Sequence, residues 1–212
     1  MNYLAHARLS FDQPDILVGN MISDFVKGKK RFDYSEPVQK GITLHRAIDT
    51  FTDEHEATKE AKKFFKPAVG LYAGAFMDIV YDHFLATDEN EFSSEQALLD
   101  FSISVYRQLE NEAPILPQKF NRLFPYMKSE NWLYNYRTIW GIGKSFSGLM
   151  HRAKYLEYNS VVLESFQKNY DQLKVYYNFF FPAVKTFAQH NNHLPWFALD
   201  RYSSEYLPQY RT

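Results

Sequence analysis

Apolar residues along this chain recur three or four positions apart almost throughout, the spacing that places them on one face of a helix. Asn-Gly and Asp-Gly turns are absent, and alternating apolar and polar runs are few, so the usual signals of β-hairpins are missing. The 212 residues contain no internal repeat, low-complexity tract or long linker. The pattern therefore predicts an all-α protein that forms one single-domain helical bundle over residues 1–212.

Capping residues and prolines suggest where the helices begin and end. Ser35 is a good N-cap, Pro14 and Pro37 suit a first turn, and Gly28 is a natural stop. Pro182 should kink the last helix or end it one residue earlier. We expect helices or helical turns at 2–9, 14–26, 35–51, 52–65, 67–85, 93–110, 119–127, 132–137, 143–153 and 159–188, and a polar tail from 191.

Two polar residues stand out in the apolar-periodic stretch 41–53. His45 and Asp49 lie four positions apart, so a helix places them on one face, one above the other. An imidazole and a carboxylate arranged in this way can hold one divalent ion or share one proton. The alternative is a core histidine whose ring is oriented by the carboxylate.

A second polar group interrupts the apolar stretch 75–85, which contains Asp78, Asp82 and His83. A helix that is apolar all round is expected to be buried, and buried carboxylates are costly unless they are paired or bind a metal. We therefore expect this helix and the one carrying His45 to face each other across a metal site. The alternative is that Asp82 bonds a buried Tyr or Arg while Asp78 faces solvent.

Further candidates lie close to these two stretches. Asn20 and Asp24 are one helical turn apart, and Asp24 could join the site or lie in solvent. Arg46 follows His45 and could clamp a phosphate or pair with a nearby carboxylate. His6 has no partner nearby in sequence. A short basic run follows Asp24 and could bind an acidic or phosphate-bearing partner, or simply be solvated: Lys27, Lys29, Lys30 and Arg31.

Composition narrows the chemistry. The formal net charge is -1, so no overall positive field attracts nucleic acid. The chain has no cysteine, which leaves His, Asp, Glu, Asn and water to bind manganese, magnesium, iron or zinc. Neither a signal peptide nor an apolar run long enough to span a membrane is present, and we expect a cytoplasmic location. Such a site could hydrolyse a phosphate ester, because a divalent ion activates water and polarises a phosphoryl oxygen.

Two other motifs carry little weight. Gly143, Lys144 and Ser145 resemble the end of a phosphate-binding P-loop, but Thr138 stands where that pattern needs a glycine. The two histidines near the end of the chain lie in a polar segment before a proline, where ordinary solvation is expected. They are His190 and His193.

Five motifs, in order, resemble the acyl carrier protein phosphodiesterase family. They are N-Y-L-A-H at 2–6, G-N-M-I-S-D-F-V at 19–26, H-R-A-I-D-T-F-T-D at 45–53, D-I-V-Y-D-H-F-L at 78–85 and S-E-N-W-L-Y-N-Y-R at 129–137. The resemblance implies an all-α enzyme distantly related to HD-type metal phosphohydrolases, although the adjacent pair Asp82-His83 reverses the HD order. It also implies manganese, or another divalent ion such as Mg²⁺ or Fe²⁺.

The implied reaction hydrolyses the phosphodiester that joins 4'-phosphopantetheine to a serine of holo acyl carrier protein. A small acidic carrier protein agrees with the basic run. An HD-like phosphohydrolase acting on a nucleotide or other small phosphoester is the alternative, and a non-catalytic helical binding module is a third hypothesis. The expected metal ligands are His45, Asp49, Asp78, Asp82, His83 and Asp24; the expected catalytic residues are Asp24, Arg46 and His6; and the expected substrate contacts are Asn20, Lys27, Lys29, Lys30 and Arg31.

Overall fold

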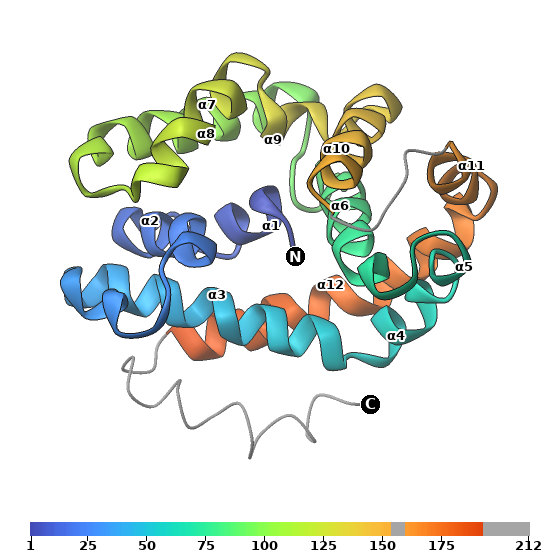
Figure 1. Ribbon diagram of the computed structural model, residues 1–212, viewed down its shortest axis with the longest axis horizontal. Coiled ribbons are helices and arrows are strands. Elements are labelled where there is room, and N and C mark those ends of the chain that lie inside the picture. The colour runs from blue at the N-terminus through green and yellow to red at the C-terminus, as the bar shows by residue number, and fades with distance from the viewer. Residues whose placement is uncertain (154–159, 193–212) are drawn as a thin grey trace.

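The computed structural model describes residues 1–153 and 160–192, and every regular element in these two ranges is a helix (Figure 1). The predicted all-α class is therefore confirmed. None of the described helices is long and apolar enough to cross a membrane. The α-helices are α1 (Tyr3–Arg8), α2 (Pro14–Ile22), α3 (Glu36–Glu54), α4 (Glu56–Lys62), α5 (Lys66–Val69), α6 (Ala73–Ala86), α7 (Glu95–Asn111), α8 (Gln118–Ser129), α9 (Trp132–Asn135), α10 (Ile139–Arg152), α11 (Val161–Lys168) and α12 (Tyr170–Asn192); 3-10 helices are η1 (Ser23–Phe25), η2 (Gly28–Asp33), η3 (Gly70–Tyr72) and η4 (Ala113–Ile115).

Helices α2 and α3 cross in backbone contact. A Cβ added to Gly19 would lie 2.1 Å from the Val38 carbonyl oxygen, and one added to Gly41 would lie 2.3 Å from the Ile16 carbonyl oxygen. Only glycine fits at such a distance. The close crossing brings the end of α2 against the middle of α3, where His45 lies.

The short helix α1 lies in the interior, with the start of the chain near the centre of the molecule (Figure 1). Six residues are too few to form a stable helix alone, and side chains from elsewhere satisfy its first N–H groups. Asn2 Oδ1 accepts from Tyr3 N at 3.0 Å. The two carboxylate oxygens of Asp82 on α6 accept from Leu4 N at 2.7 Å and Ala5 N at 3.1 Å. Asp82 therefore joins α1 to α6.

Aromatic side chains pack α12 against α3 and α6. The ring centroids of Phe51 and Phe187 are 4.6 Å apart, and those of Tyr81 and Phe180 are 4.4 Å apart. Offset aromatic pairs of this kind add stability beyond the area they bury. In the lower layer of Figure 1, α12 therefore packs along α3 and holds it in place.

Several predicted helix boundaries are wrong for local reasons. The helix expected at 67–85 is broken by Gly70, whose φ of 54° lies in the left-handed region. The helix expected at 159–188 is divided at Asn169, and α12 continues through Pro182 instead of ending before it. The helix expected to reach Val26 ends at Ile22 and continues as the 3-10 turn η1.

Candidate metal centre

Two imidazoles and one carboxylate converge at the crossing of α1, α2 and α3. His6, His45 and Asp49 each offer a ligand atom, and these atoms all lie within 4.8 Å of one another. His45 Nε2 is 3.1 Å from Asp49 Oδ2, and His6 Nε2 is 3.2 Å from Asp49 Oδ1. The two rings stack with centroids 3.8 Å apart. Asp49 thus presents one oxygen to each ring.

Asn20 fixes the orientation of both imidazoles. Its carbonyl oxygen lies 2.7 Å from His45 Nδ1, and its side-chain Oδ1 lies 2.9 Å from His6 Nδ1. Asn20 Nδ2 donates to the His6 carbonyl and to Ser10 Oγ, which identifies Oδ1 as an acceptor. Each Nδ1 therefore carries the hydrogen and donates it, so both Nε2 lone pairs point toward Asp49.

The Nε2 atoms and the carboxylates can share a proton or a divalent ion. His45 Nε2 faces a second carboxylate oxygen, Asp24 Oδ1, at 3.2 Å. His6 Nε2 is buried and has no hydrogen-bond partner among the described residues, although it lies close to Asp49. One proton on His45 could satisfy that ring but would leave His6 Nε2 unsatisfied. Two imidazole nitrogens and a carboxylate are a donor set that suits a divalent ion such as iron, manganese or zinc.

The pKa values of His45 and His6 are both shifted by burial and by the neighbouring groups. Burial disfavours the imidazolium form of His45, but hydrogen bonds to Asp24 and Asp49 outweigh it and raise the pKa of His45 to about 9. Burial and the neighbouring His45 lower the pKa of His6 to about 4. The pair therefore holds one proton near neutral pH, and a metal ion bound there would have to displace it.

Asp24 lies at the outer edge of the cluster, on η1. Its side chain is 70% exposed, so solvent can reach the carboxylate beside His45. The hydrogen bond with His45 outweighs burial and lowers the pKa of Asp24 below its ordinary value. A carboxylate that is ionised at neutral pH and close to a metal site can accept a proton from water.

Asp78 is linked to the cluster through the Met1 ammonium. The Met1 ammonium lies 3.2 Å from Asp49 Oδ1 and 3.0 Å from Asp78 Oδ1. Burial lowers the pKa of this ammonium, but Asp78 and Asp49 outweigh the effect and raise it to about 11. The polar faces of α3 and α6, which are predicted to face each other, are therefore linked through Met1. Helix α3 packs mainly on α2 and α12, α6 packs mainly on α10 and α1, and the start of the chain lies between them.

The structure places three of the predicted site residues away from the cluster. Both Asp82 oxygens accept N–H groups of α1, as described above. His83 donates from Nδ1 to the Tyr136 carbonyl at 2.8 Å, and its Nε2 accepts from the Tyr170 hydroxyl at 3.0 Å. Arg46 donates to the Val26 carbonyl at 2.8 Å. The expected roles of Asp82 and His83 as ligands, and of Arg46 as a phosphate clamp, do not fit these contacts.

Asn20 also departs from its predicted role. Its side chain is fully buried, so the contacts with His6 and Ser10 replace the expected contact with substrate. The residue holds the ligands in place rather than lining the entrance.

A cavity of ≈ 490 Å³ opens onto the cluster. His6, Asp24, His45 and Asp78 lie in its wall, together with two cations that sequence reasoning missed, Lys119 of α8 and Arg152 of α10. Among the described residues Arg152 forms no ion pair, and its side chain is exposed. The cavity wall therefore combines carboxylates, imidazoles and two cations.

The predicted basic run lies beside this cavity. Lys27 and Lys30 line a neighbouring depression of ≈ 740 Å³ that shares Asp24 and Lys119 with it. Lys29 and Arg31 belong to the same 3-10 helix, η2, but do not line that depression. Part of the basic run thus lies at the edge of the site, as expected from its position after Asp24.

The structure also shows where the P-loop-like motif and one of the two late histidines lie. The 143–145 segment lies within helix α10 rather than in a loop, so it is not a P-loop. His190 is near the end of α12, and His193 lies outside the described residues.

Known proteins match this chain over most of its length. The family model described as acyl carrier protein phosphodiesterase matches residues 1–184. A protein of that name from Klebsiella pneumoniae is 32% identical over 189 residues, which cover 89% of this chain and 98% of the relative. Proteins of the same name from Yersinia pestis and Escherichia coli are 30% and 31% identical, covering 90% and 87% of this chain and 98% and 95% of the relatives. No solved structure matches, so the expected HD-like relationship stays a prediction.

Proposed function

The chain belongs to the acyl carrier protein phosphodiesterase family, and we propose that it hydrolyses the phosphodiester between 4'-phosphopantetheine and the serine of holo acyl carrier protein. Water adds to phosphorus, and the bond between phosphorus and the serine oxygen breaks. The serine oxygen takes up a proton, which gives apo carrier protein and free 4'-phosphopantetheine. The cytoplasmic location expected from the sequence remains a prediction.

One observation carries the proposal: two imidazole Nε2 atoms, both fixed by Asn20, face Asp49 at the wall of a cavity that also holds Lys119 and Arg152. His6, His45 and Asp49 would hold a divalent ion, with Asp24 beside them. Such an ion supplies positive charge for the phosphoryl oxygens and lowers the pKa of water. Three protein ligands leave coordination positions for other groups.

The remaining residues have roles that follow from their place in the cavity. Asp24 is ionised and reachable by solvent, so it is the candidate general base. Lys119 and Arg152 would bind the phosphate oxygens in place of Arg46, because they line the cavity and Arg46 does not. Lys27 and Lys30 would bind the acidic surface of the carrier protein, since they are exposed and line the depression beside the cavity.

The direct test is a mass measurement on holo acyl carrier protein incubated with the purified protein and Mn²⁺. Loss of the phosphopantetheine mass is expected, and a chelator should prevent it. Asp24→Asn should lower kcat by roughly 10²- to 10⁴-fold, the range for removal of a general base. His45→Gln should abolish turnover and tight Mn²⁺ binding.

A histidine outside the cluster provides the matched control. His55 caps α4 by accepting from Ala57 N at 3.2 Å, and asparagine is also a good N-cap. His55→Asn should therefore keep both activity and metal. An unchanged carrier-protein mass, together with turnover of nucleotides by the same preparation, would instead favour the small-phosphoester alternative.

A further inference from the structure

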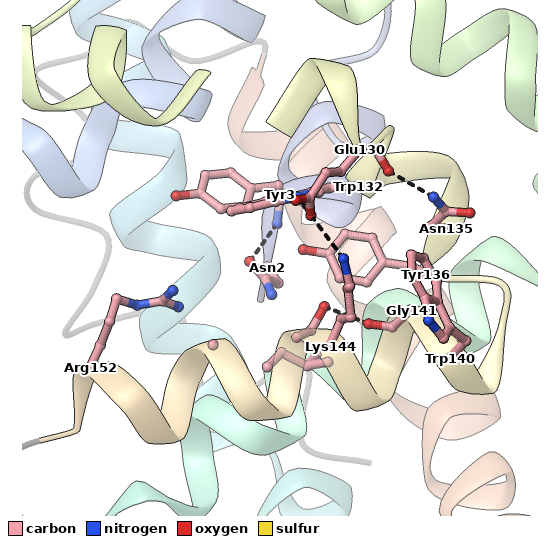
Figure 2. Close-up of a pocket in the computed structure, with 13 residues that line it drawn as sticks. Asn2, Tyr3, Glu130, Trp132, Asn135, Tyr136, Trp140, Gly141, Lys144 and Arg152 are labelled. Atoms are coloured by element: carbon pink, nitrogen blue, oxygen red, sulfur yellow. Dashed lines mark hydrogen bonds and ion pairs between the residues drawn. The ribbon is translucent and has the colours of Figure 1, made fainter. Parts of the chain in front are cut away.

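A second cavity adjoins the metal-site cavity and shares part of its wall. It has a volume of ≈ 210 Å³ and lies between α1, α9 and α10 (Figure 2). The residues common to both cavities are Asn2, Tyr3, Ile79, Trp132 and Arg152. Figure 2 shows Arg152 at one end of α10 and Trp140 and Lys144 toward the other end, with Tyr3 across from the helix. A molecule bound at the metal site could therefore extend into this space.

Aromatic rings form much of the second cavity. Trp132, Tyr136 and Trp140 all lie in its wall. The ring centroids of Tyr3 and Trp132 are 6.3 Å apart at the boundary with the metal site. Trp140 is 59% exposed, so part of its side chain is accessible to a ligand in this cavity. Flat aromatic walls favour a chain of carbon atoms and planar amides.

The charges in this cavity neutralise each other. Lys144 Nζ lies 3.8 Å from Glu130 Oε2 and 4.7 Å from the centre of the Trp140 ring. Trp132 Nε1 donates to the same Glu130 oxygen at 3.1 Å. The part of the cavity distant from Arg152 is thus unsuited to a second phosphate and suited to an uncharged ligand.

Polar groups are nonetheless available. Asn2 Oδ1 accepts from Tyr3 N, and no described residue accepts from the Asn2 amide NH₂, which can therefore donate to a ligand carbonyl. Asn135 donates from Nδ2 to the Glu130 carbonyl at 2.7 Å, so its side-chain oxygen can accept. One donor and one acceptor in an aromatic cavity match a ligand that carries amide groups.

We propose that this second cavity binds the pantetheine arm of the substrate, an uncharged chain with two amide groups. The inference rests on the proposed function, which places the phosphodiester beside His45. The basic depression near Lys27 then lies on the serine side of the phosphate, and the aromatic cavity lies on the opposite side, beyond Tyr3 and Arg152. The metal site between them would cut the substrate where protein and arm meet.

A pair of glycines on α10 allows a matched test. A Cβ at Gly148, in the wall of the aromatic cavity, would meet only the end of the Arg152 side chain at 3.4 Å. A Cβ at Gly143, outside that cavity, would meet only the Leu163 side chain at 3.7 Å. Gly148→Leu should fill the cavity without breaking the helix, and Gly143→Leu makes the same change where no arm should bind.

Two readouts separate this inference from the proposed function. Pantetheine, which lacks phosphate, should change the tryptophan fluorescence saturably in the parent and in Gly143→Leu, but not in Gly148→Leu. The KM for holo carrier protein should rise roughly ten-fold in Gly148→Leu alone. Because pantetheine carries no phosphate, its loss of binding in this variant reports on the arm cavity and not on the phosphate contact of Arg152.

The outcomes are distinct. Saturable pantetheine binding without carrier-protein hydrolysis would keep the binding site and overturn the proposed function. Carrier-protein hydrolysis with equal KM values in the two glycine variants would overturn the binding site and keep the function. Absence of a pantetheine-dependent fluorescence change in the parent would also overturn the binding site.

Discussion

Replacing Asn20 by alanine should damage both the stability of the fold and the affinity for metal. The Asn20 side chain makes three buried hydrogen bonds, with His6 Nδ1, the His6 carbonyl and Ser10 Oγ. Its loss leaves the His6 N–H without a partner in the interior. The ring can then rotate or change tautomer, so its Nε2 lone pair no longer faces Asp49.

The size of each effect can be worked out from these contacts. Three hydrogen bonds at about 1 kcal/mol each give a loss of about 3 kcal/mol in the free energy of unfolding. The His6 carbonyl keeps its bond from Ser10 Oγ at 2.8 Å, so the loss should not exceed that figure by much. Removal of a residue that orients a ligand typically weakens metal binding by about 10- to 100-fold.

Asn191 offers a matched control because it is also a buried asparagine. Its side chain makes one such bond, from Nδ2 to the Phe187 carbonyl at 2.7 Å. Asn191→Ala should cost about 1 kcal/mol and leave metal affinity unchanged. Urea unfolding with a chelator present measures stability without the contribution of bound metal, and titration of the folded proteins with Mn²⁺ measures affinity. Equal losses in the two variants, in stability and in affinity, would refute the reasoning about Asn20.

Three further predictions address the fold around the site. Gly41→Ala should destabilise the protein by about 1–3 kcal/mol because its Cβ would meet backbone of α2. Gly143→Ala, whose Cβ would make only an ordinary contact with the Leu163 side chain at 3.7 Å, should be neutral or slightly stabilising in the same thermal unfolding assay. Glu91→Gln should cost about 2–3 kcal/mol, because Glu91 accepts from Arg8 at 3.0 Å and Lys185 at 2.5 Å, yet Mn²⁺ affinity should not change. The pKa of His45 is raised from 6.5 to about 9, so protonated His45 contributes at most about 3 kcal/mol to the free energy of unfolding measured in chelator. That contribution is complete below pH 6.5 and should be lost as pH rises through about 9. His45→Gln should remove this dependence of stability on pH, and an unchanged pH dependence would contradict the assignment.

The sequence was sufficient for those parts of the site that depend on local spacing. His45 and Asp49 are one helical turn apart, so the helix itself brings their side chains together. Asp24 follows a short helix whose end lies at the crossing of Gly19 and Gly41, and it reaches His45 as expected. The all-α class followed in the same way from the period of apolar residues.

Other parts depend on contacts between distant segments, which spacing does not reveal. His6 has no local partner, and it joins the cluster only because α1 is held in the interior by Asp82, 76 positions away in a different helix. Lys119 and Arg152 lie in ordinary amphipathic helices that also carry other basic residues, so nothing in their surroundings marked them as part of a cavity. Arg46 looked better placed, but α3 turns it toward the Val26 carbonyl.

The interpretation of Asp82 shows why a buried carboxylate alone is weak evidence for a metal ligand. The expectation was that burial requires a compensating cation. The structure offsets part of that cost with two N–H groups at the start of α1, where the helix dipole also favours negative charge, but burial outweighs them and raises the pKa of Asp82 to about 7. Asp82 is fully buried and makes no contact with the cluster, whereas the Asp49 side chain is 40% exposed and faces the imidazole nitrogens, so the deeper burial of Asp82 did not indicate a metal ligand.

The same distinction separates a metal centre from a purely structural network. A structural His–Asp network is expected to close on itself, with every buried polar atom paired, as His83 is with Tyr136 and Tyr170. The pair formed by His6 and His45 does not close in this way, because His6 Nε2 lies 3.2 Å from Asp49 Oδ1 without making a hydrogen bond in the described chain, and both rings line an open cavity. A buried nitrogen left unsatisfied costs about 1–3 kcal/mol, a penalty that a bound cation would remove. This contrast between two kinds of buried histidine in one protein is the strongest argument against a non-catalytic helical module.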